Sequence, residues 1–549
     1  MALKHVNAVV VGAGAGGGVV AKELSEAGLS VVILERGGWV SFEEHGQDEL
    51  LNQRTTVLGN AYGPDDRSPR VVETGPGTWE IVMPHEGGYS NNAACVGSGT
   101  VSYGAMAWRY MEKDFRMRST YGAPEGSTLE DWPISYDDLE PFYEKAEQEV
   151  GVSGDMSANP FAAPRRRAYP MPAFPYNTEG RILEAAAKRL GLHPFPIPML
   201  RNSVPYGGRN ACVHNRYCCG FACPNNAKNG THNTVIPRAL ATGNCELRTH
   251  SMAREVVVDD RGVARGVRYF DESDAEQLQT ADLVVVSGGA IETARLLLNS
   301  RSRLFPNGAG NRYDWVGRNL QGHAYCGADG LFEEKTFDDV GPGATIAISD
   351  FNHGNPGLRG GAALCNEFIR PPYGFSGMRP PGQPSWGKAH KEFQRRFYKR
   401  SVSIRGPVQE MPVFDARMQI DPSVTDHWGI PVARLSGSRH LHDIEIGRVM
   451  AARAQAWLME AGAVATWTNV PGPGLSGGQH QAGTCRMGTD PKTSVANRFG
   501  QVHDIENLFL SDASLHVTNG GFNPVLTIMA LGYWVGGHIR ARWKDGKLT

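Results

Sequence analysis

The feature that most constrains the fold is a glycine-rich turn near the start of the chain, set between a strand and a helix. Residues 6–11 (VNAVVV) form an apolar run typical of a buried strand, and the helix-like run VVAKELSEA follows the turn. A second apolar run, LSVVIL, ends at Glu35 and completes a strand–turn–helix–strand unit. Gly12 permits the tight turn, Gly14 lets the backbone approach a pyrophosphate, and Gly17 lets helix and strand pack closely.

These features predict a dinucleotide-binding unit at the start of the chain. The N-terminus of the helix faces the phosphates of the ligand, and the carboxylate of Glu35 reaches its ribose hydroxyls. The unit alone fits FAD and NAD equally. Proteins that bind NAD usually continue with further strand–helix repeats, whereas residues 36–130 are rich in turns and interrupt the pattern. We therefore expect a flavoprotein and keep an NAD(H)-dependent enzyme as the alternative.

The length and the charge of the chain exclude several classes of protein. A chain of 549 residues is larger than one hydrophobic core usually allows, so we expect two domains. The 55 Lys and Arg residues nearly balance the 57 Asp and Glu residues, for a net charge of −2. This balance excludes electrostatic attraction of the whole protein to nucleic acid or to anionic lipid. No apolar run approaches the roughly 20 residues that a membrane-spanning helix requires.

Several polar positions near the end of the chain suggest a redox site. Asn523 and Pro524 precede an apolar helical run, where we expect them to be the N-cap and the first helical residue. The positive end of a buried helix beside a flavin would stabilise the negative charge that appears on reduction. Asp512 follows a strand-like run and is expected to bind ribityl or phosphate-bridging groups, and His480 is suited to remove a hydroxyl proton. Ordinary helix capping and a structural histidine stay open as alternatives.

The chain resembles the glucose–methanol–choline (GMC) family of FAD oxidoreductases over nearly its whole length. The resemblance implies an α/β fold, with a Rossmann-like FAD-binding domain built from separate parts of the chain and a substrate domain on an antiparallel sheet. It places the catalytic histidine of the family at His480 and the second active-site residue at Asn523. The matching segments, in the order of the family, are GAGAGG with Glu35, DWPISYDDLEPFYEKAE (131–147), VSGGAIETARLLLNS (286–300), VGRNLQGH (316–323), HQAGTCRMG (480–488) and GGFNPVLTIMAL (520–531).

The resemblance also implies that the chain crosses between the two domains several times. The FAD-binding domain is expected to include a cysteine loop in its second part and the catalytic pair in its last part. The expected boundaries are 1–130, 205–323 and 471–549 for the FAD-binding domain, and 131–204 and 324–470 for the substrate domain.

The region around Gly97 departs from the family. The stretch GSGTVSYGAM stands where many members have a GGSS or GGT sequence next to the flavin, so we expect Gly97 and Thr100 to contact the cofactor without the strict family spacing. Ser102 stands where some sugar-oxidising members carry a histidine that attaches the flavin covalently. Because no histidine is present there, we expect FAD to be bound non-covalently.

Within the family, the chain looks most like bacterial enzymes that oxidise sugars or the ring 3-hydroxyl of glycosides. The phrase AMAWRYMEKDFRM (105–117), the cysteine loop and the Asn523-Pro524 ending carry this narrower resemblance. The expected reaction oxidises a CH–OH group by hydride transfer to flavin N5. His480 takes the hydroxyl proton, and the electrons pass to a non-NAD acceptor.

Other readings of the same sequence stay open. An oxidase that reduces O2 to H2O2 fits the same motifs, and an electron-transfer or scaffold flavoprotein subunit is the alternative outside catalysis. Gln409 and Glu410 lie on what is expected to be a strand facing the site, and they are candidates for binding sugar hydroxyls.

Four of the nine cysteines gather in one loop, at Cys212, Cys218, Cys219 and Cys223. Some sugar dehydrogenases of the family carry an iron–sulfur cluster on a C-x5-C-x3-C loop. Here each gap occurs once, but no three of the cysteines fit both gaps. A cluster held by thiolates and a loop in which the cysteines pack as small apolar residues both stay open.

The other five cysteines are scattered, and the odd total is typical of a reduced chain. The first residues show no apolar stretch followed by a cleavage site, so we expect a cytoplasmic protein; export to the periplasm with a signal-bearing small subunit is the alternative. The basic segment 388–400 (KAHKEFQRRFYKR) is expected to be a solvated helix face. Docking of an acidic electron acceptor such as a cytochrome is the alternative for that segment.

Overall fold

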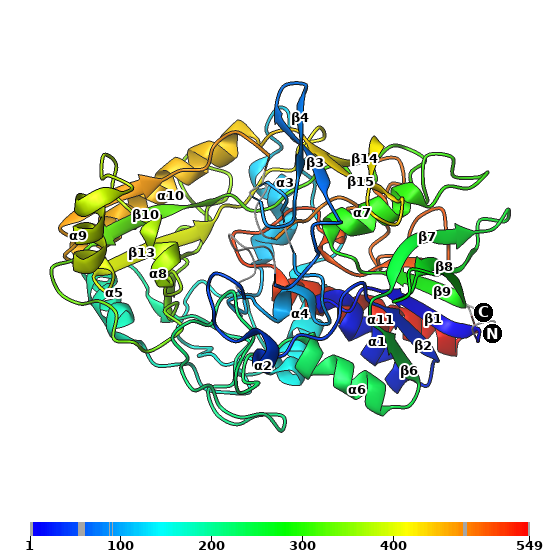
Figure 1. Ribbon diagram of the computed structural model, residues 1–549, viewed down its shortest axis with the longest axis horizontal. Coiled ribbons are helices and arrows are strands. Elements are labelled where there is room, and N and C mark those ends of the chain that lie inside the picture. Colours follow the sequence, from blue (N-terminus) through cyan, green and yellow to red (C-terminus); the bar gives the residue numbers. More distant parts are fainter. Residues whose placement is uncertain (1–3, 53–60, 87, 91, 476–479, 547–549) are drawn as a thin grey trace.

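The computed structural model describes residues 4–52, 61–86, 88–90, 92–475 and 480–546, which form three main sheets (Figure 1). The strands of the largest sheet are β1 (Val6–Val11), β2 (Val31–Leu34), β6 (Cys245–Arg248), β7 (Met252–Val258), β8 (Ala264–Phe270), β9 (Glu276–Val286) and β17 (Leu508–Leu510). Their order is β6-β2-β1-β9-β8-β7, and β17 pairs with β9 outside this path.

The parallel part of this sheet contains the predicted strand–turn–helix–strand unit. β1 pairs in parallel with β2 and β9, and β17 pairs in parallel with β9. Every residue of β2 and of β17 is buried, as expected for strands that are covered on both faces. The predicted buried strand at residues 6–11 is confirmed as β1, and a hairpin turn around residues 259–262 joins β7 to β8.

Helices surround the sheets, and no helix in the described part of the chain is long and apolar enough to cross a membrane. The helix over residues 136–146 continues as a π-helical turn over residues 147–151. The helices are α1 (Ala15–Glu26), α2 (Phe42–His45), α3 (Met117–Tyr121), α4 (Tyr136–Ala146), α5 (Thr178–Arg189), α6 (Val235–Ala241), α7 (Ala290–Asn299), α8 (Pro372–Ser376), α9 (Gly387–Phe397), α10 (Leu441–Glu460) and α11 (Val525–Lys544).

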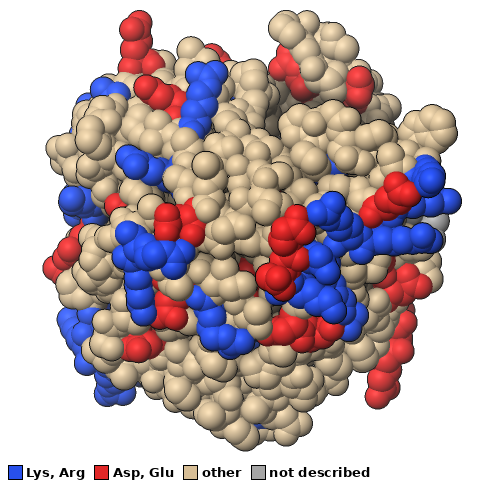
Figure 2. All heavy atoms as spheres, turned by 90° about the vertical axis from the view of Figure 1, so that its left-hand side faces the viewer, with Lys and Arg blue, Asp and Glu red and all other residues tan. Residues whose placement is uncertain are grey.

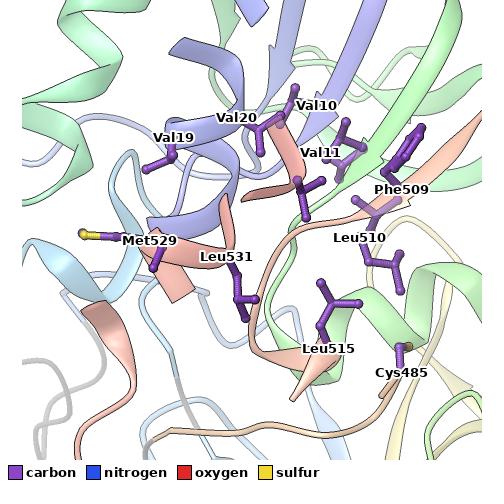
Figure 3. Close-up of a cluster of buried hydrophobic side chains, with 14 of the residues drawn as sticks. Val10, Val11, Val19, Val20, Cys485, Phe509, Leu510, Leu515, Met529 and Leu531 are labelled. Atoms are coloured by element: carbon purple, nitrogen blue, oxygen red, sulfur yellow. The ribbon is translucent and has the colours of Figure 1, made fainter. Parts of the chain in front are cut away.

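The two ends of the chain pack against each other. Helix α1 lies between α6 and α11, and the N- and C-terminal ends of the chain lie at the same edge of the molecule (Figure 1). Figure 3 shows Val10 and Val19 of the N-terminal unit in the same buried cluster as Leu510 and Leu531. This packing brings the segments after residue 480 to the glycine turn, although almost the whole chain separates them in sequence.

The second sheet is antiparallel and six-stranded. Its strands are β5 (Phe195–Pro196), β10 (Tyr325–Leu331), β11 (Ile346–Ile348), β12 (Leu364–Asn366), β13 (Ser401–Pro407) and β16 (Ala465–Asn469), in the order β16-β10-β13-β12-β11-β5. Figure 1 places this sheet at the opposite end of the molecule from β1, with α5 and α10 against it. The fold is therefore the expected α/β arrangement of a Rossmann-like part and an antiparallel part.

The two faces of the six-stranded sheet differ in character. Ala328, Leu364 and Ile404 belong to a buried apolar cluster that includes residues of α5 and α10. Because side chains alternate along a strand, their neighbours Asp329 and Arg405 point to the opposite face. On that face Arg405 Nη2 donates to both carboxylate oxygens of Asp329, at 2.8 and 2.7 Å.

A third sheet was not anticipated by the sequence analysis. It contains β3 (Arg70–Gly75), β4 (Thr78–Val82), β14 (Arg417–Thr425) and β15 (Pro431–Ser436), in the order β14-β15-β3-β4. β15 pairs in parallel with β3, so the sheet joins segments that the expected boundaries assigned to different domains. Local sequence patterns do not carry this kind of long-range pairing.

The predicted basic helix is present as α9, with Phe393 as its buried residue. Arg396 forms an ion pair with Glu333, and Lys399, just after the helix, pairs with Asp339. Figure 2 shows the face on which α9 lies, and the Lys and Arg side chains there are interspersed with Asp and Glu. The observed pairing agrees with a solvated helix face.

Candidate active site

A cavity of about 510 Å³ lies where the parallel sheet, the polar face of the six-stranded sheet and the start of α11 meet. Val11 and Val286 open into it from the carboxyl ends of β1 and β9, Tyr325 and Arg405 line it from the six-stranded sheet, and Val525 lines it from α11. Open parallel sheets bind ligands beyond the carboxyl ends of their strands. The position and the volume are those of a ligand-binding site.

The glycine turn after β1 forms one wall of the cavity. Gly12 has φ +96°, and a Cβ on it would come within 2.5 Å of the carbonyl oxygen of Ser287, so the turn requires glycine there. A Cβ on Gly17 would come within 2.1 Å of the carbonyl oxygen of Gly12, which fits its predicted role in close packing. Gly12 and Gly14 line the cavity, whereas Gly17 lies behind them in α1.

Glu35 lies at the end of β2 and lines the same cavity. Its Oε2 accepts a hydrogen bond from the backbone N–H of Ala13 at 2.8 Å, and its Oε1 accepts one from Gly37 at 3.0 Å. Burial raises the pKa of the Glu35 carboxyl, and these backbone donors oppose the rise. The carboxyl group is thus fixed at the cavity wall, and its contact with a ribose stays a prediction.

The stretch from Gly97 to Ser102 lines the neighbouring wall. The Thr100 hydroxyl donates to the carbonyl oxygen of Gly97 at 2.6 Å and accepts from the N–H of Thr231 at 3.3 Å. Within the described part of the chain, the buried Ser102 hydroxyl has no hydrogen-bond partner. A buried hydroxyl left unpaired costs about 1–3 kcal/mol, so this wall fits a polar ligand such as a flavin dinucleotide.

Asp512 lies two residues after the end of β17 and is buried at the cavity. Its Oδ2 accepts from the N–H of Gly289 at 2.9 Å and from the hydroxyl of Thr293 at 2.5 Å, while Oδ1 accepts from the N–H of Ser514 at 2.8 Å. Burial raises the pKa of the Asp512 carboxyl, and the same donors oppose the rise. Asp512 therefore ties the end of β17 to the start of α7 at the cavity wall, and its contact with the cofactor stays a prediction.

His480 and Asn523 meet at the cavity, as the sequence analysis expected of a catalytic pair. His480 Nε2 lies 3.5 Å from Asn523 Nδ2. On the other edge of the ring, His480 Nδ1 lies 3.0 Å from Nδ1 of His323. The backbone of His480 is held by Asn519, whose side-chain amide donates to the His480 carbonyl oxygen at 2.9 Å. Residues 476–479, directly before His480, lie outside the described residues.

The expected capping role of Asn523 is wrong. Helix α11 begins at Val525, its N-cap is Pro524, and no side chain caps it. The Asn523 side chain points elsewhere: its Oδ1 accepts from the indole N–H of Trp108 at 2.9 Å, and its Nδ2 donates to the Tyr325 hydroxyl at 3.1 Å. Because an indole N–H can only donate, this contact fixes the amide with its NH2 group toward His480. Pro524 and the first turn of α11 do line the cavity.

Gln409 and Glu410 do not lie where the sequence analysis expected them. β13 ends at Pro407, so neither residue is part of a strand, and neither lines the cavity. Gln409 Nε2 donates to Asp114 Oδ1 at 2.7 Å. The carboxylate of Glu410 is buried and accepts hydrogen bonds from backbone N–H groups on either side of His323. Both side chains are therefore engaged within the protein, behind the cavity.

The cysteine loop gives no support to the iron–sulfur alternative. Cys212, Cys218 and Cys223 line a small separate pocket together with Lys228, whereas Cys219 lines the large cavity. Among the residues that the structure describes, no group of three or more His, Cys, Asp or Glu side chains is arranged to hold a metal ion. The geometry is that of a loop whose cysteines form no disulfide and pack within the protein.

Several residues in or beside the site were missed from the sequence. Trp108 and His323 stood in segments that served only to identify the resemblance. Glu367, Arg370 and Arg405 line the cavity from the antiparallel sheet and the loop after β12. Burial raises the pKa of the Glu367 carboxyl, against the pull of Arg405 and Arg370. Charged residues within otherwise apolar strand runs are the signal that could have identified this face.

A parallel sheet with a glycine turn, and a cavity that ends on an imidazole and a carboxamide, define a dinucleotide-dependent oxidoreductase. The chain belongs to the GMC oxidoreductase family, whose models match residues 125–325 and 412–532. Members of this family bind FAD and oxidise CH–OH groups, so this chain is an FAD-dependent oxidoreductase of that kind.

Curated relatives match along almost the whole chain. The gluconate 2-dehydrogenase flavoprotein of Pantoea cypripedii is 29% identical over 98% of this chain and 94% of the relative. The 2-methyl-1,2-propanediol dehydrogenase of Mycolicibacterium austroafricanum is 31% identical over 98% and 96%. The 6'''-hydroxyparomomycin C oxidase of Streptomyces lividus is 30% identical over 95% and 89%. A crystal structure of formate oxidase covers all of both chains at 14% identity with a TM-score of 0.66, which supports the fold alone.

Proposed function

We propose that this enzyme oxidises a CH–OH group of a sugar or glycoside to a carbonyl, with His480 as the base and Asn523 as a hydrogen-bond donor to the reacting oxygen. The observation that carries the proposal is the pair of nitrogens, His480 Nε2 and Asn523 Nδ2, 3.5 Å apart at the cavity. His480, which can accept the hydroxyl proton, thus lies beside Asn523, which can donate a hydrogen bond to the oxygen that loses this proton.

The chemistry divides between the cofactor and the protein. FAD, when bound, accepts the hydride that leaves the substrate carbon. His480 Nε2 takes the hydroxyl proton, and this proton stays on the imidazole. The electron pair of the O–H bond then forms the second bond of the carbonyl group, while hydrogen leaves the carbon with the C–H electron pair as the hydride. Asn523 Nδ2 donates to the developing negative oxygen, and its orientation is already set by Trp108 before substrate arrives.

The polar face of the six-stranded sheet supports a polyhydroxylated substrate. Tyr325, whose hydroxyl accepts from Asn523, begins the same sheet that carries Asp329 and Arg405. Glu367, Arg370 and Arg405 line the cavity, so this face offers both hydrogen-bond acceptors and donors to a ligand with many hydroxyl groups. Relatives named for gluconate and for an aminoglycoside support the same class.

The residues that would hold FAD are those of the parallel sheet and its neighbouring loops. Gly12 and Gly14 offer backbone to the pyrophosphate, and Glu35 offers carboxylate oxygens to a ribose. The other proposed cofactor contacts are Gly97, Thr100, Asp512 and Pro524. Gly17 supports this set through packing alone.

The electron acceptor is proposed to be a non-NAD carrier, such as a cytochrome or a small partner subunit, and O2 is the second candidate. A relative named as the large subunit of fructose dehydrogenase supports the first, and the paromomycin-type oxidase supports the second. None of the nine cysteines forms a disulfide in the described part of the chain, which supports a cytoplasmic location, with co-export beside a partner subunit as the alternative. Turnover with a dye but not with O2 would favour the carrier.

Replacement of His480 by Ala tests the proposal. We expect kcat to fall by about 10²-fold or more, with FAD content and the visible flavin spectrum unchanged. The exposed His193→Ala variant is the matched control and should keep wild-type turnover. A His480→Ala enzyme with wild-type kcat would remove the base, and wild-type enzyme that turns over none of D-glucose, D-fructose, D-gluconate and methyl glucoside would remove the substrate class.

A further inference from the structure

The imidazole of His323 contacts the edge of the His480 ring that faces away from Asn523. We propose that His323 is a positioning residue, which holds His480 in the tautomer that carries its proton on Nδ1 and its lone pair on Nε2. This inference rests on the proposed function of His480 as the base. It assigns a role to a buried residue that touches neither the reacting oxygen nor the cavity.

Hydrogen-bond chemistry fixes the direction of the contact. His323 Nε2 lies 2.5 Å from the carbonyl oxygen of Gly520, which can only accept, so the proton of His323 is on Nε2. Burial lowers the pKa of His323, so the ring is neutral and its Nδ1 has a lone pair. Two Nδ1 atoms 3.0 Å apart require one donor, so His480 Nδ1 carries a proton and donates it. The lone pair of neutral His480 is then on Nε2, facing Asn523.

The backbone holds the two rings in register. Gln321 and Ala482 form an antiparallel bridge, with N–H to O distances of 3.0 and 2.9 Å. His323 comes two residues after Gln321, and His480 comes two residues before Ala482. Because the segments run antiparallel, the two histidines lie opposite each other. Both have left-handed backbones, with φ +52° and +68°, a conformation that is uncommon outside glycine and that concentrates at active sites.

Glu410 keeps His323 in this strained conformation. Its Oε2 accepts from the N–H of Gly322 at 2.9 Å, and its Oε1 accepts from the N–H of Ala324 at 2.7 Å. One buried carboxylate therefore grips the backbone on both sides of the histidine. This contact also gives a role to Glu410, which the sequence analysis expected to bind substrate.

The charged and titratable groups around His323 come from four segments. His480 and Glu410 are described above, Asp114 acts on its charge from the turn before α3, and His516 lies near it beyond η5, a short turn at Ala513–Leu515. The two acidic groups favour a proton on His323, and burial opposes them more strongly. A protonated His323 would lose its acceptor and turn the contact with His480 into a clash of two donors.

Two substitutions of nearly equal size separate positioning from packing. His323→Asn keeps an acceptor oxygen near the place of Nδ1, whereas His323→Leu fills the site without one. With D-glucose or the fastest sugar of the panel and phenazine methosulfate as acceptor, we expect kcat of the Leu variant to fall by about 10²-fold, with KM within about threefold and FAD retained. The Asn variant should keep kcat within about tenfold of wild type.

If the Leu variant does not retain FAD, His323→Gln takes its place, because the longer amide reaches the position of Nε2 rather than that of Nδ1. The kcat of the Gln variant should then fall by the same factor that is expected for the Leu variant. The inference would be overturned if the Asn variant lost as much kcat as the Leu variant or the Gln variant that replaces it. It would also be overturned if the Leu or Gln variant kept wild-type kcat.

A double-mutant cycle separates failure of this inference from failure of the proposed function. If His323 acts through His480, the variant His323→Leu with His480→Ala should be no slower than His480→Ala alone. A full additional loss in the double variant would contradict the positioning role while His480 stays the base. Wild-type kcat in His480→Ala would instead contradict the proposed function.

Discussion

The parallel sheet and the six-stranded antiparallel sheet contribute to the cavity in different ways. Of the parallel strands, β2 and β17 are wholly apolar and β1 nearly so, and the functional groups stand beyond their ends, as with Gly12 after β1, Glu35 after β2 and Asp512 after β17. The antiparallel strands carry functional groups along one whole face, as with Tyr325 and Arg405.

This difference follows from what covers each sheet. When a strand is buried on both faces, its side chains all pack against the covering helices. A ligand can therefore bind only beyond its carboxyl end. A sheet that packs helices on one face alone can present alternate residues to a cavity on the other. Cofactor sites of the first kind depend on backbone approach, and substrate sites of the second kind depend on side chains that can change without loss of the fold.

The largest effect is expected where the parallel part allows no side chain at all. A Cβ on Gly16 would stand 1.6 Å from the carbonyl oxygen of Ser511, so Gly16→Ala must displace α1 from β17. We expect almost no folded, flavin-containing protein in the soluble fraction. Gly537→Ala in α11 is the matched control, because its Cβ would meet Phe142 at an ordinary 3.6 Å. Normal flavin content in the Gly16 variant would show that the turn tolerates a side chain.

Asp512→Ala tests a strand-end carboxylate. The change leaves the N–H of Gly289 and the hydroxyl of Thr293 without their acceptor, at a cost of about 2–4 kcal/mol. We expect a lower melting temperature and a flavin that is lost on gel filtration. A variant with normal stability and normal FAD retention would contradict the role of Asp512 in joining β17 to α7.

Glu367→Gln tests the polar face of the antiparallel sheet. The substitution keeps the size of the side chain and removes its charge and two of its acceptor sites. We expect KM for the sugar to rise about tenfold, a loss of about 1.4 kcal/mol in binding, with kcat within about threefold. Flavin content should stay at the wild-type level. An equal loss of kcat and flavin would show that the two sheets are not separable in function.

A fourth prediction concerns the pH dependence of stability. Burial lowers the pKa of His516 to about 3, against about 6.5 in an unfolded chain. Between these two pH values, His516 binds a proton in the unfolded chain but not in the folded protein. The free energy of unfolding therefore falls as pH drops from 6.5 toward 3, by about 1.4 kcal/mol per pH unit. His516→Phe should flatten this slope between pH 4 and 6 in denaturant titrations. An unchanged slope would contradict a neutral, buried His516.

Much of the parallel part could be predicted from local sequence. A glycine turn between two apolar runs specifies both the βαβ unit and the ligand that approaches it, because each glycine has its own steric reason. The meeting of His480 with Asn523 followed from resemblance rather than from spacing. Their placement depends on packing between the first and last parts of the chain, seen in the contact of α1 with α11.

The rest depended on tertiary register that no local pattern carries. Glu410 has the composition of a substrate ligand, yet two backbone N–H groups beside His323 take its oxygens. Asn523 has the composition of an N-cap, yet the indole of Trp108, far away in sequence, takes its oxygen instead. In both cases a polar side chain that suits a local role is engaged by a partner that only the fold supplies.

The most direct test of the account is the rate at which sugar bleaches the bound flavin without oxygen present. In stopped-flow mixing at saturating sugar, wild-type enzyme should lose its visible flavin band in a fast phase. His480→Ala should bind FAD equally well and bleach about 10²-fold more slowly. Bleaching at the wild-type rate in that variant would contradict the claim that the imidazole brought in by the last part of the chain is the base.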